Sequence, residues 1–346
     1  MAAGRAWRVL VTGGAGFIGS AFVRRLLLRD PERSVVVLDK LTYAGNRANL
    51  APVEDAPGFR FVEGDIADPD IVDELAAQAD AIVNFAAESH VDRSIEAPDA
   101  FIRTDVYGTY VLLEAARRHQ HAAYLQVSTD EVYGEVPEGS AREEDPAAPR
   151  SPYAASKAAG DLLAHAYHVT YGVNTRVTRG SNTYGPYQFP EKIIPLFATN
   201  AIDRQELPLY GDGLQVREWL HVDDHCAGIE LALEEGEAGG TYNIGGGNEI
   251  TNLELTRLIL GELGLPETLV RSVPDRPGHD RRYSVDSTRL RRLGWSPRAP
   301  FREGLAATVR WYVEHPEWWR PLKDDDYLDY YRRQYGERLA AGTALK

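Results

Sequence analysis

A tyrosine and a lysine in this 346-residue chain have the types and spacing needed for proton transfer. Tyr153 and Lys157 stand four positions apart near the start of a predicted helix over 152–171, so both side chains project from one face. A nearby ammonium favours the phenolate, and we expect the pKa of Tyr153 to fall from about 10 toward the range of a general base. Alone, such a pair is more often a surface contact.

Two adjacent carboxyl groups, Asp130 and Glu131, follow a predicted strand in the segment Ser128-Thr-Asp-Glu-Val-Tyr-Gly134. The carboxyl ends of strands in open α/β sheets are where ligands bind. If their environments separate their pKa values, one carboxyl group can donate a proton while the other accepts one. The alternative is a capped turn whose acids face solvent.

A glycine-rich segment, Thr12-Gly-Gly-Ala-Gly-Phe-Ile-Gly19, joins the first predicted strand to the first predicted helix. Gly13 and Gly14 allow a tight turn, Gly16 lets backbone N–H groups approach a pyrophosphate, and Gly19 lets the helix pack closely on the strand. This context predicts a dinucleotide site rather than a tight turn with no nucleotide.

The second predicted strand supports this reading, because Asp39 follows it twenty positions after Gly19. Its carboxylate can accept hydrogen bonds from an adenosine ribose, and its charge repels a 2′-phosphate. We therefore expect NAD rather than NADP, although the basic neighbour Lys40 weakens that preference. An oxidised nicotinamide ring adds to the lysine in favouring a tyrosine phenolate.

The elements that must position these groups alternate between short β-branched runs and longer helical segments, which predicts an α/β fold of the Rossmann type with a doubly wound parallel sheet. Predicted strands, all taken as buried on both faces, are Arg8–Thr12, Ser34–Leu38, Phe59–Glu63, Ala81–Phe85, Ala123–Ser128 and Thr175–Arg179. Predicted helices are Phe17–Arg29, Pro69–Ala77, Asp99–His119 and Pro152–Tyr171.

The sequence pattern changes after Asn182, where Pro and Gly residues separate isolated short predicted strands. We expect an NAD-binding Rossmann domain over 1–182 and a second, mainly substrate-binding lobe over 183–346, with some strands and helices returning to the first sheet. The aromatic segment 311–319 is interpreted as packing or a subunit contact rather than chemistry.

Composition excludes several classes of protein. Lys and Arg number 38 against 52 Asp and Glu, a net charge of −14 that repels nucleic acid and anionic lipid. No export signal or membrane-spanning segment is visible, and the lone Cys226 cannot form an intrachain disulfide, so we expect a soluble cytoplasmic protein. A metal site at His221-Val-Asp-Asp-His225 is not expected, because the predicted elements split these groups between faces.

The phosphate loop together with Tyr153-Ala-Ala-Ser-Lys157 resembles the extended short-chain dehydrogenase/reductase superfamily of nucleotide-sugar enzymes. Four segments are similar to the dTDP-glucose 4,6-dehydratase family within it: Ala86-Ala-Glu-Ser-His-Val-Asp-Arg-Ser94, Ser128-Thr-Asp-Glu-Val-Tyr-Gly134, Gly185-Pro-Tyr-Gln-Phe-Pro-Glu-Lys192 and Arg276-Pro-Gly-His-Asp280. The Asp-Glu pair discriminates most, because related epimerases and decarboxylases usually lack the aspartate.

The resemblance implies an NAD-dependent hydro-lyase that turns dTDP-glucose into dTDP-4-keto-6-deoxy-glucose by an internal redox cycle. Tyr153 would remove the C4 hydroxyl proton, with Thr129 on the C4 oxygen and Lys157 holding the nicotinamide ribose. Glu131 would take the C5 proton while Asp130 protonates the departing C6 hydroxyl. The resemblance also implies a homodimer, and it implies that the lobe over 183–346 mainly binds the nucleotide-sugar.

The family's binding residues carry over position by position. Those implied to line NAD are Gly13, Gly16, Phe17, Ile18, Gly19, Asp39, Lys40, Leu41, Thr42, Asp65, Ile66, Ala86, Ala87, Thr104, Tyr153, Lys157 and Thr183. Those implied to meet the nucleotide-sugar are Ser89, Thr129, Asp130, Glu131, Asn182, Glu191, Lys192, Pro208, Tyr210, Arg217, Asn252, Arg276 and His279. Arg217 suits a diphosphate clamp, its alternative being a surface ion pair with Glu218 or Asp212.

The chain departs from the family pattern at three positions. Gly180 stands where a small residue or cysteine is usual, Thr183 replaces a second asparagine near the nicotinamide, and Gly247 replaces a residue that is often bulkier. Other readings stay open: the same reaction on UDP-glucose, a nucleotide-sugar 4-epimerase or decarboxylase using the same Tyr153 and Lys157, or a non-catalytic NAD-sensing protein. Asp130 argues against the epimerase and decarboxylase readings. The sequence leaves the choice between thymine and uracil undecided.

Overall fold

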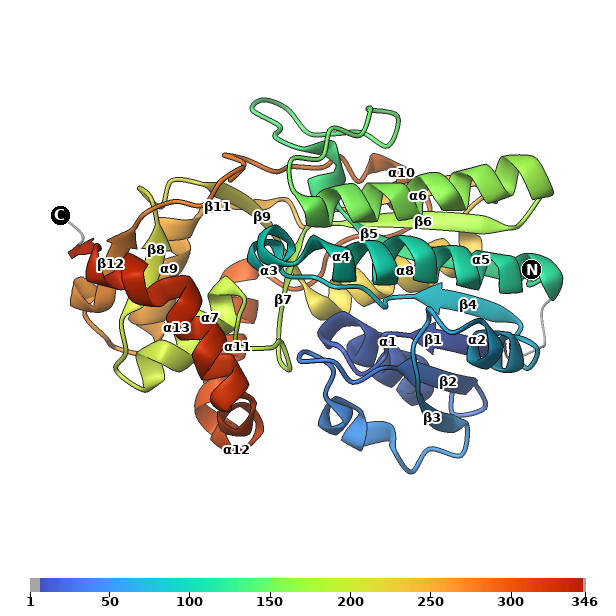
Figure 1. Cartoon of the computed structure of the whole chain (residues 1–346), viewed down its shortest axis with the longest axis horizontal. Coiled ribbons are helices and arrows are strands. Elements are labelled where there is room, and N and C mark those ends of the chain that lie inside the picture. Colours follow the sequence, from blue (N-terminus) through green and yellow to red (C-terminus); the bar gives the residue numbers. More distant parts are fainter. Residues whose placement is uncertain (1–6, 345–346) are drawn as a thin grey trace.

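A seven-stranded parallel sheet forms the larger half of the molecule in the computed structural model, which describes residues 7–344 (Figure 1). The strand order is β10-β6-β5-β4-β1-β2-β3. The strands are β1 (Arg8–Thr12), β2 (Ser34–Asp39), β3 (Phe59–Glu63), β4 (Ala81–Asn84), β5 (Ala123–Thr129), β6 (Thr175–Gly180) and β10 (Gly240–Ile244). The order reverses between β1 and β4, and ligands bind at such a point.

Apolar side chains alternate along the central strands, so each face of the sheet carries its own helical layer. Val9 and Val11 of β1 pack under α1 (Phe17–Arg29) and α8 (Val222–Glu235). Leu10, between them, belongs to the opposite core. That face is covered by α2 (Pro69–Ala76), α5 (Thr109–Arg118) and α6 (Pro152–Tyr171). This doubly wound arrangement confirms the predicted fold class.

Two predictions about elements are wrong in detail. β3 is not buried on both faces, because it is the edge strand of the sheet and its Arg60 and Glu63 are exposed. The predicted helix 99–119 is wound in three ways, as α4 (Pro98–Phe101), a π-helical segment η2 (Ile102–Gly108) and α5. Such π segments are frequent at functional sites. Here the π segment carries Thr104 and Asp105.

The second lobe holds two three-stranded sheets with a separate apolar core. Its strands are β7 (Asn182–Tyr184), β8 (Leu207–Tyr210), β9 (Val216–His221), β11 (Asn248–Thr251), β12 (Val270–Val273) and β13 (Thr343–Ala344). Its helices are α7 (Ile193–Ile202), α9 (Asn252–Glu262), α11 (Phe301–Glu314), α12 (Pro316–Trp319) and α13 (Asp325–Ala340). Between these elements the chain returns to the larger half as α8 and β10, and β10 pairs with β6.

The remaining elements are short and lie between these strands and helices along the chain. They are η1 (Arg47–Val53), α3 (Val91–Glu96), η3 (Asp130–Tyr133), η4 (Glu267–Leu269), α10 (Thr288–Arg292) and η5 (Arg320–Leu322). In residues 7–344, none of the helices combines the length and the apolar character needed to cross a bilayer.

Candidate active site

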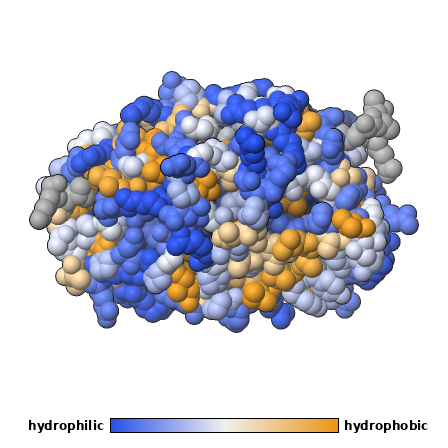
Figure 2. Space-filling view, turned by 90° about the horizontal axis from the view of Figure 1, so that it is seen from above, coloured by the Kyte–Doolittle hydropathy of each residue, from blue (hydrophilic) through white to orange (hydrophobic). Residues whose placement is uncertain are grey.

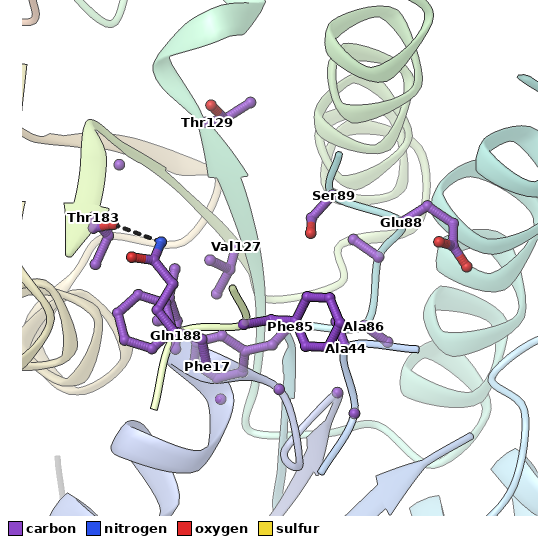
Figure 3. A pocket seen from close by; sticks show the side chains of 18 of the residues that line it. Phe17, Ala44, Phe85, Ala86, Glu88, Ser89, Val127, Thr129, Thr183 and Gln188 are labelled. Carbon is purple, nitrogen blue, oxygen red and sulfur yellow. Dashed lines mark hydrogen bonds between the residues drawn. The ribbon is translucent and has the colours of Figure 1, made fainter. Parts of the chain in front are cut away.

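A cavity of about 340 Å³ runs along the carboxyl edge of the sheet, from the phosphate loop to the end of β5. In Figure 3, Phe17 and Ala86 lie at one end of it and Thr129 at the other, with Val127 between. A smaller cavity of about 150 Å³ continues into the second lobe. Both cavities are lined by Glu131, Asn182, Glu191 and Lys192, so one elongated site spans the two halves.

The sequence-predicted residues lie along this site with one exception. Of the cofactor set, Gly13, Gly16, Phe17, Ile18, Gly19, Asp39, Lys40, Thr42, Asp65, Ile66, Ala86, Ala87, Thr104, Tyr153, Lys157 and Thr183 line the larger cavity. Of the substrate set, Ser89, Thr129, Asp130, Glu131, Asn182, Glu191 and Lys192 line the larger cavity, and Pro208, Tyr210, Arg217, Asn252, Arg276 and His279 line the smaller one. Leu41 lines neither and takes a left-handed φ of 52°.

The phosphate loop leaves no room for side chains at two of its glycines. Gly13 has a φ of +68°, and a Cβ there would lie 2.5 Å from the backbone nitrogen of Ala86. A Cβ on Gly19 would lie 2.2 Å from the carbonyl oxygen of Gly13. Gly16 precedes the first turn of α1 without a side-chain cap, so the N–H groups of that turn are available to a phosphate. The loop therefore fits a dinucleotide.

Asp39 lies at the end of β2, buried beside the phosphate loop. Its Oδ2 accepts a hydrogen bond from Ala15 N at 2.8 Å, and its Oδ1 accepts one from Leu41 N at 2.9 Å. Burial raises the pKa of this carboxyl group, opposed by the two backbone donors. The neighbouring Lys40 is drawn to Asp65, with Nζ 2.8 Å from Oδ2. This pairing leaves Lys40 less able to offset the charge of Asp39.

Tyr153 and Lys157 do share one face of α6, but the expected lowering of the tyrosine pKa is wrong for the protein groups alone. Burial raises the pKa of Tyr153 well above its ordinary value, and the carboxyl groups of Glu131 and Asp105 raise it further. Lys157 is buried, and its Nζ donates to the carbonyl oxygen of Val127 at 2.7 Å. Desolvation is therefore the largest influence on the pKa of Tyr153 in the protein alone.

Asp105 is a buried carboxyl group that the sequence analysis did not single out. It accepts hydrogen bonds from Ser156 Oγ at 2.7 Å and from Glu88 N at 3.0 Å. Burial raises its pKa to about 6, and the charge of Lys157 opposes the rise. Asp105 therefore couples the π segment to the helix that carries Tyr153 and Lys157.

Asp130 and Glu131 begin the short helix η3, whose first turn is capped by Thr129. The Thr129 hydroxyl accepts from Glu131 N at 3.3 Å and donates to Asp130 Oδ1 at 3.1 Å. Asp130 is buried and its Oδ2 has no hydrogen-bond partner among residues 7–344. The turn is capped, as in the alternative of a simple capped turn, but Asp130 does not face solvent as that alternative also required.

The two carboxyl groups have different electrostatic surroundings. Burial raises the pKa of Asp130 well above its ordinary value, and Glu131 and Glu218 add to that rise. Burial also raises the pKa of Glu131, but the cations of Arg276, Arg217 and Lys192 oppose it. The surroundings therefore favour the protonated form of Asp130, whereas the cations near Glu131 favour its ionised form.

Arg217 is buried on β9 rather than paired at the surface. Its guanidinium donates to the carbonyl oxygen of Asp280 at 3.0 Å and lies 4.3 Å from the ring centre of Tyr283. Among the described residues it forms no ion pair, and Asp212 pairs instead with Arg281 at 2.8 Å. The surface ion-pair reading is therefore wrong, and the site presents a buried cation to the smaller cavity.

Unpartnered polar atoms mark the same region. Asn182 Oδ1 and Asn252 Oδ1 are buried and have no hydrogen-bond partner within residues 7–344. Arg276 donates to Asp92 Oδ1 at 3.0 Å, and Tyr210 donates to its Oδ2 at 3.0 Å. Cationic groups and free amide oxygens in one cavity suit a ligand with phosphates and a polar base.

Comparison with known proteins decides the family. The family described as GDP-mannose 4,6 dehydratase matches residues 10–308. The chain is 58% identical over 324 residues to the dTDP-glucose 4,6-dehydratase of Streptomyces niveus, covering 92% of this chain and 96% of the relative. The chain belongs to the nucleotide-sugar 4,6-dehydratase family. The resemblance to extended short-chain dehydrogenase/reductases is confirmed.

Solved structures of this dehydratase family share the fold. DesIV, a dTDP-glucose 4,6-dehydratase from Streptomyces venezuelae with NAD and TYD bound, is 57% identical with a TM-score of 0.90, covering 91% of this chain and all of that one. A UDP-glucose 4-epimerase from Thermus thermophilus in complex with NAD is 34% identical with a TM-score of 0.83, covering 89% of this chain and 99% of that one. The fold thus serves epimerases as well as dehydratases.

The departures at 180 and 183 from the dehydratase pattern are linked by His225, which the sequence analysis considered only as a metal ligand. Thr183 Oγ1 lies 2.8 Å from His225 Nδ1, and Gln188 Nε2 donates to the Thr183 carbonyl oxygen at 3.0 Å (Figure 3). A Cβ on Gly180 would lie 2.4 Å from the imidazole. The glycine therefore leaves space for the ring that holds Thr183.

His225 is an uncharged part of the cavity wall. It is buried, and burial lowers its pKa to about 4. Across residues 7–344 there is no cluster of three or more His, Cys, Asp or Glu side chains that could hold a metal ion.

Gly247 has a φ of +72° with open space around its Cα, and only the backbone conformation accounts for a glycine there.

Proposed function

We propose that this chain removes water from dTDP-glucose to give dTDP-4-keto-6-deoxy-glucose, as an NAD-dependent hydro-lyase. The observation that carries the proposal is Asp130, a buried carboxyl group with a free oxygen beside the more ionisable Glu131, in the cavity that also holds the phosphate loop. The family membership and the NAD-bound relatives support the same conclusion.

The phosphate loop and Asp39 hold the dinucleotide in this proposal, with Lys157 and Thr183 at its nicotinamide end. When bound, NAD accepts a hydride from the sugar and returns it within one turnover, and its cationic ring favours the tyrosine phenolate. The ring thus opposes the burial that raises the pKa of Tyr153. Asp39 accepts from the adenosine ribose, using lone pairs that its two backbone donors leave free.

Tyr153 takes the proton of the C4 hydroxyl, and Thr129 hydrogen-bonds the C4 oxygen. The resulting C4 ketone makes the C5 hydrogen acidic, so Glu131 can take it as a proton. Asp130 gives its proton to the C6 oxygen, which leaves as water. Glu131 then returns its proton to C5. Asp130 ends one proton short while Tyr153 holds one extra, so a proton must pass between them before the next turnover.

The smaller cavity binds the nucleotide. Arg217 and Arg276 clamp the diphosphate, since guanidinium groups match phosphate oxygens in two-point contacts. Tyr210 lies beside the base, and Asn252 supplies a buried amide oxygen. UDP-glucose is the competing substrate, and the two nucleotides differ only in the base and the ribose 2′-hydroxyl.

The direct test incubates the purified protein with dTDP-glucose and with UDP-glucose separately and looks for loss of one water by mass spectrometry. We expect loss of water from dTDP-glucose. A change of C4 configuration without water loss would contradict the proposal and support an epimerase. In Asp130→Asn we expect water loss to slow by roughly 10²–10⁴-fold while C4 oxidation persists. Equal slowing of both steps would remove Asp130 as the acid.

We also propose that the enzyme is cytoplasmic and forms a homodimer. The two copies pair through α5 and α6. Exposed apolar side chains occur on both helices and on η2: Leu162, Val169 and Tyr171 are 55–68% exposed, and Ile102, Tyr107 and Tyr110 are 42–56% exposed. On the face seen in Figure 2, apolar side chains form several patches between hydrophilic areas. Exposed apolar side chains on two helices that contact each other are typical of a surface that binds a partner.

The pairing is tested by light scattering on two matched variants. Leu162→Arg is expected to yield monomers, whereas Leu28→Arg, at an equally exposed leucine on α1, is expected to leave the dimer intact. A wild-type protein that is monomeric at micromolar concentration would contradict the pairing.

A further inference from the structure

A tryptophan of the second lobe reaches across to the segment beside the phosphate loop. Trp318, on α12, donates its indole Nε1–H to Asn49 Oδ1 at 3.0 Å. Asn49 belongs to η1 in the larger half and is 1% exposed. In Figure 1, α12 forms the lower end of the second lobe, facing the blue N-terminal segments. This contact joins residues that are 269 positions apart.

Asn49 passes the contact directly to the phosphate loop. Its Nδ2 donates to the carbonyl oxygen of Ala15 at 2.9 Å, and Asn46 N donates to the same oxygen at 3.0 Å. The Ala15 N–H is held by Asp39 at 2.8 Å. An indole N–H only donates and a carbonyl only accepts, so a single orientation of the Asn49 amide satisfies both partners. The peptide groups on both sides of Ala15 are therefore fixed.

Aromatic and cationic groups reinforce the crossing. Arg24 of α1 donates to the Asn49 carbonyl oxygen at 2.5 Å, and its guanidinium lies 4.5 Å from the ring centre of Tyr187. The Tyr187 ring contacts the Trp318 ring with centroids 5.6 Å apart, and the Trp311 ring at 4.7 Å. Tyr187 adopts a φ of +68°, which costs a non-glycine residue free energy and persists only where surrounding contacts enforce it.

The same segment forms a second wall of the cofactor cavity. Thr42, Ala44 and Gly45 line that cavity immediately before η1, and Asn46 caps η1 by accepting from Ala48 N at 3.0 Å. Fixing η1 through Asn49 therefore fixes both the loop under the pyrophosphate and the residues that flank it.

We infer that Trp318, acting through Asn49, is a positioning residue that locks the phosphate loop and slows the release of NAD. The inference rests on the proposed function, in which the dinucleotide ends each turnover in its starting oxidation state. A reaction of that kind has no need to exchange its cofactor, so slow release costs nothing in turnover. The lock joins the cofactor half to the lobe that binds the nucleotide-sugar.

The test measures how fast NAD leaves the loaded protein, by displacement with excess fluorescent etheno-NAD. Trp318→Phe keeps an aromatic ring and removes the donor, and we expect release to become about three- to tenfold faster, the effect of one buried hydrogen bond. Trp311→Phe is the matched control, because Trp311 lies in the same aromatic cluster and makes no hydrogen bond to the larger half among the described residues. We expect its release rate to equal that of the wild type.

A double variant shows whether Trp318 acts through Asn49. We expect Asn49→Ala to release NAD faster than the wild type, and in that background Trp318→Phe is expected to add less than a twofold effect. The proposed role of Trp318 would be overturned if Trp318→Phe released NAD at the wild-type rate. It would also be overturned if Trp311→Phe accelerated release equally, or if the effects of Trp318→Phe and Asn49→Ala were additive in the double variant. Conversion of dTDP-glucose by the wild type is measured separately. If the wild type did not convert dTDP-glucose, the proposed function would be contradicted, and the NAD release rates would be unaffected.

Discussion

The two walls of the active site are built in different ways. The cofactor wall is mostly backbone and small residues from neighbouring βα units, with glycines where a Cβ would collide. The nucleotide wall is made of long polar side chains brought together from β8, β9, α9 and the segment 276–283. Adding a side chain to the cofactor wall should weaken NAD binding, because the added atoms collide with the backbone. Removing a charged side chain from the nucleotide wall should weaken nucleotide binding, because the ligand loses its counter-charge. Substitutions on the two walls should therefore affect different ligands.

The largest expected effect comes from adding one methyl group to the cofactor wall. Gly13→Ala places a Cβ 2.5 Å from the Ala86 backbone at a left-handed φ, so we expect NAD affinity to fall by more than about 100-fold and the melting temperature to drop. Calorimetric titration and thermal melting measure both. Gly139→Ala is the control, with a φ of +69° but open space, and should keep its NAD affinity. An NAD affinity within threefold of wild type in Gly13→Ala would break the comparison.

The next effect comes from removing a charge from the nucleotide wall. Arg217→Ala is expected to weaken dTDP binding by about 10- to 100-fold, because it removes a buried cation that contacts no carboxylate, while NAD affinity stays the same. Arg281→Ala, which removes an exposed cation paired with Asp212, should change dTDP binding less than threefold. If Arg217→Ala lost NAD as well, the two walls would not be independent.

Asp130, which lies between the two walls, should make the stability of the protein depend on pH. The pKa of Asp130 is raised on folding, so its contribution is fully present below its unfolded pKa and is lost as pH rises through its folded pKa. The melting temperature of the wild type should therefore fall relative to that of Asp130→Asn as pH rises above the unfolded pKa of the carboxyl group, about 4. Parallel curves for the two proteins would show that Asp130 does not carry its proton in the folded state.

The smallest effect is expected at the altered corner of the nicotinamide end. Thr183→Asn restores the amide usual in the family, but His225 fills the space beside Gly180. We expect a change in NAD affinity of less than about fivefold. The double variant Thr183→Asn with His225→Ala should bind NAD more tightly than Thr183→Asn alone. The opposite order would show that His225 does not constrain residue 183.

The cofactor wall was also the more predictable of the two. Its strand, glycine turn, helix and acidic strand end are contiguous, so spacing alone pointed to Gly13 and Asp39, which line one cavity. Arg217, Asn252 and Arg276 come from distant segments, and only the family resemblance pointed to them. Asp105 was missed because it lies within a segment that reads as ordinary helix and is wound as π-helix. Trp318 was interpreted as packing, since no local pattern reveals that it reaches Asn49.

The expected lowering of the Tyr153 pKa rested on two cations, Lys157 and the oxidised nicotinamide, and the protein groups without the nicotinamide give the opposite direction. Spacing showed that an ammonium lies nearby, but desolvation depends on every element that covers the ring. Burial and the carboxyl groups of Glu131 and Asp105 raise the pKa of Tyr153 in the protein itself, and the Thr129 hydroxyl opposes the rise.

The most direct test of the account follows a single deuterium atom. dTDP-glucose carrying deuterium at C4 is incubated with the purified enzyme, and the product is examined by NMR and mass spectrometry. An internal hydride cycle predicts that the deuterium is recovered in the new C6 methyl group. Recovery of the deuterium in solvent, with a C6 methyl group that contains none of it, would contradict the account.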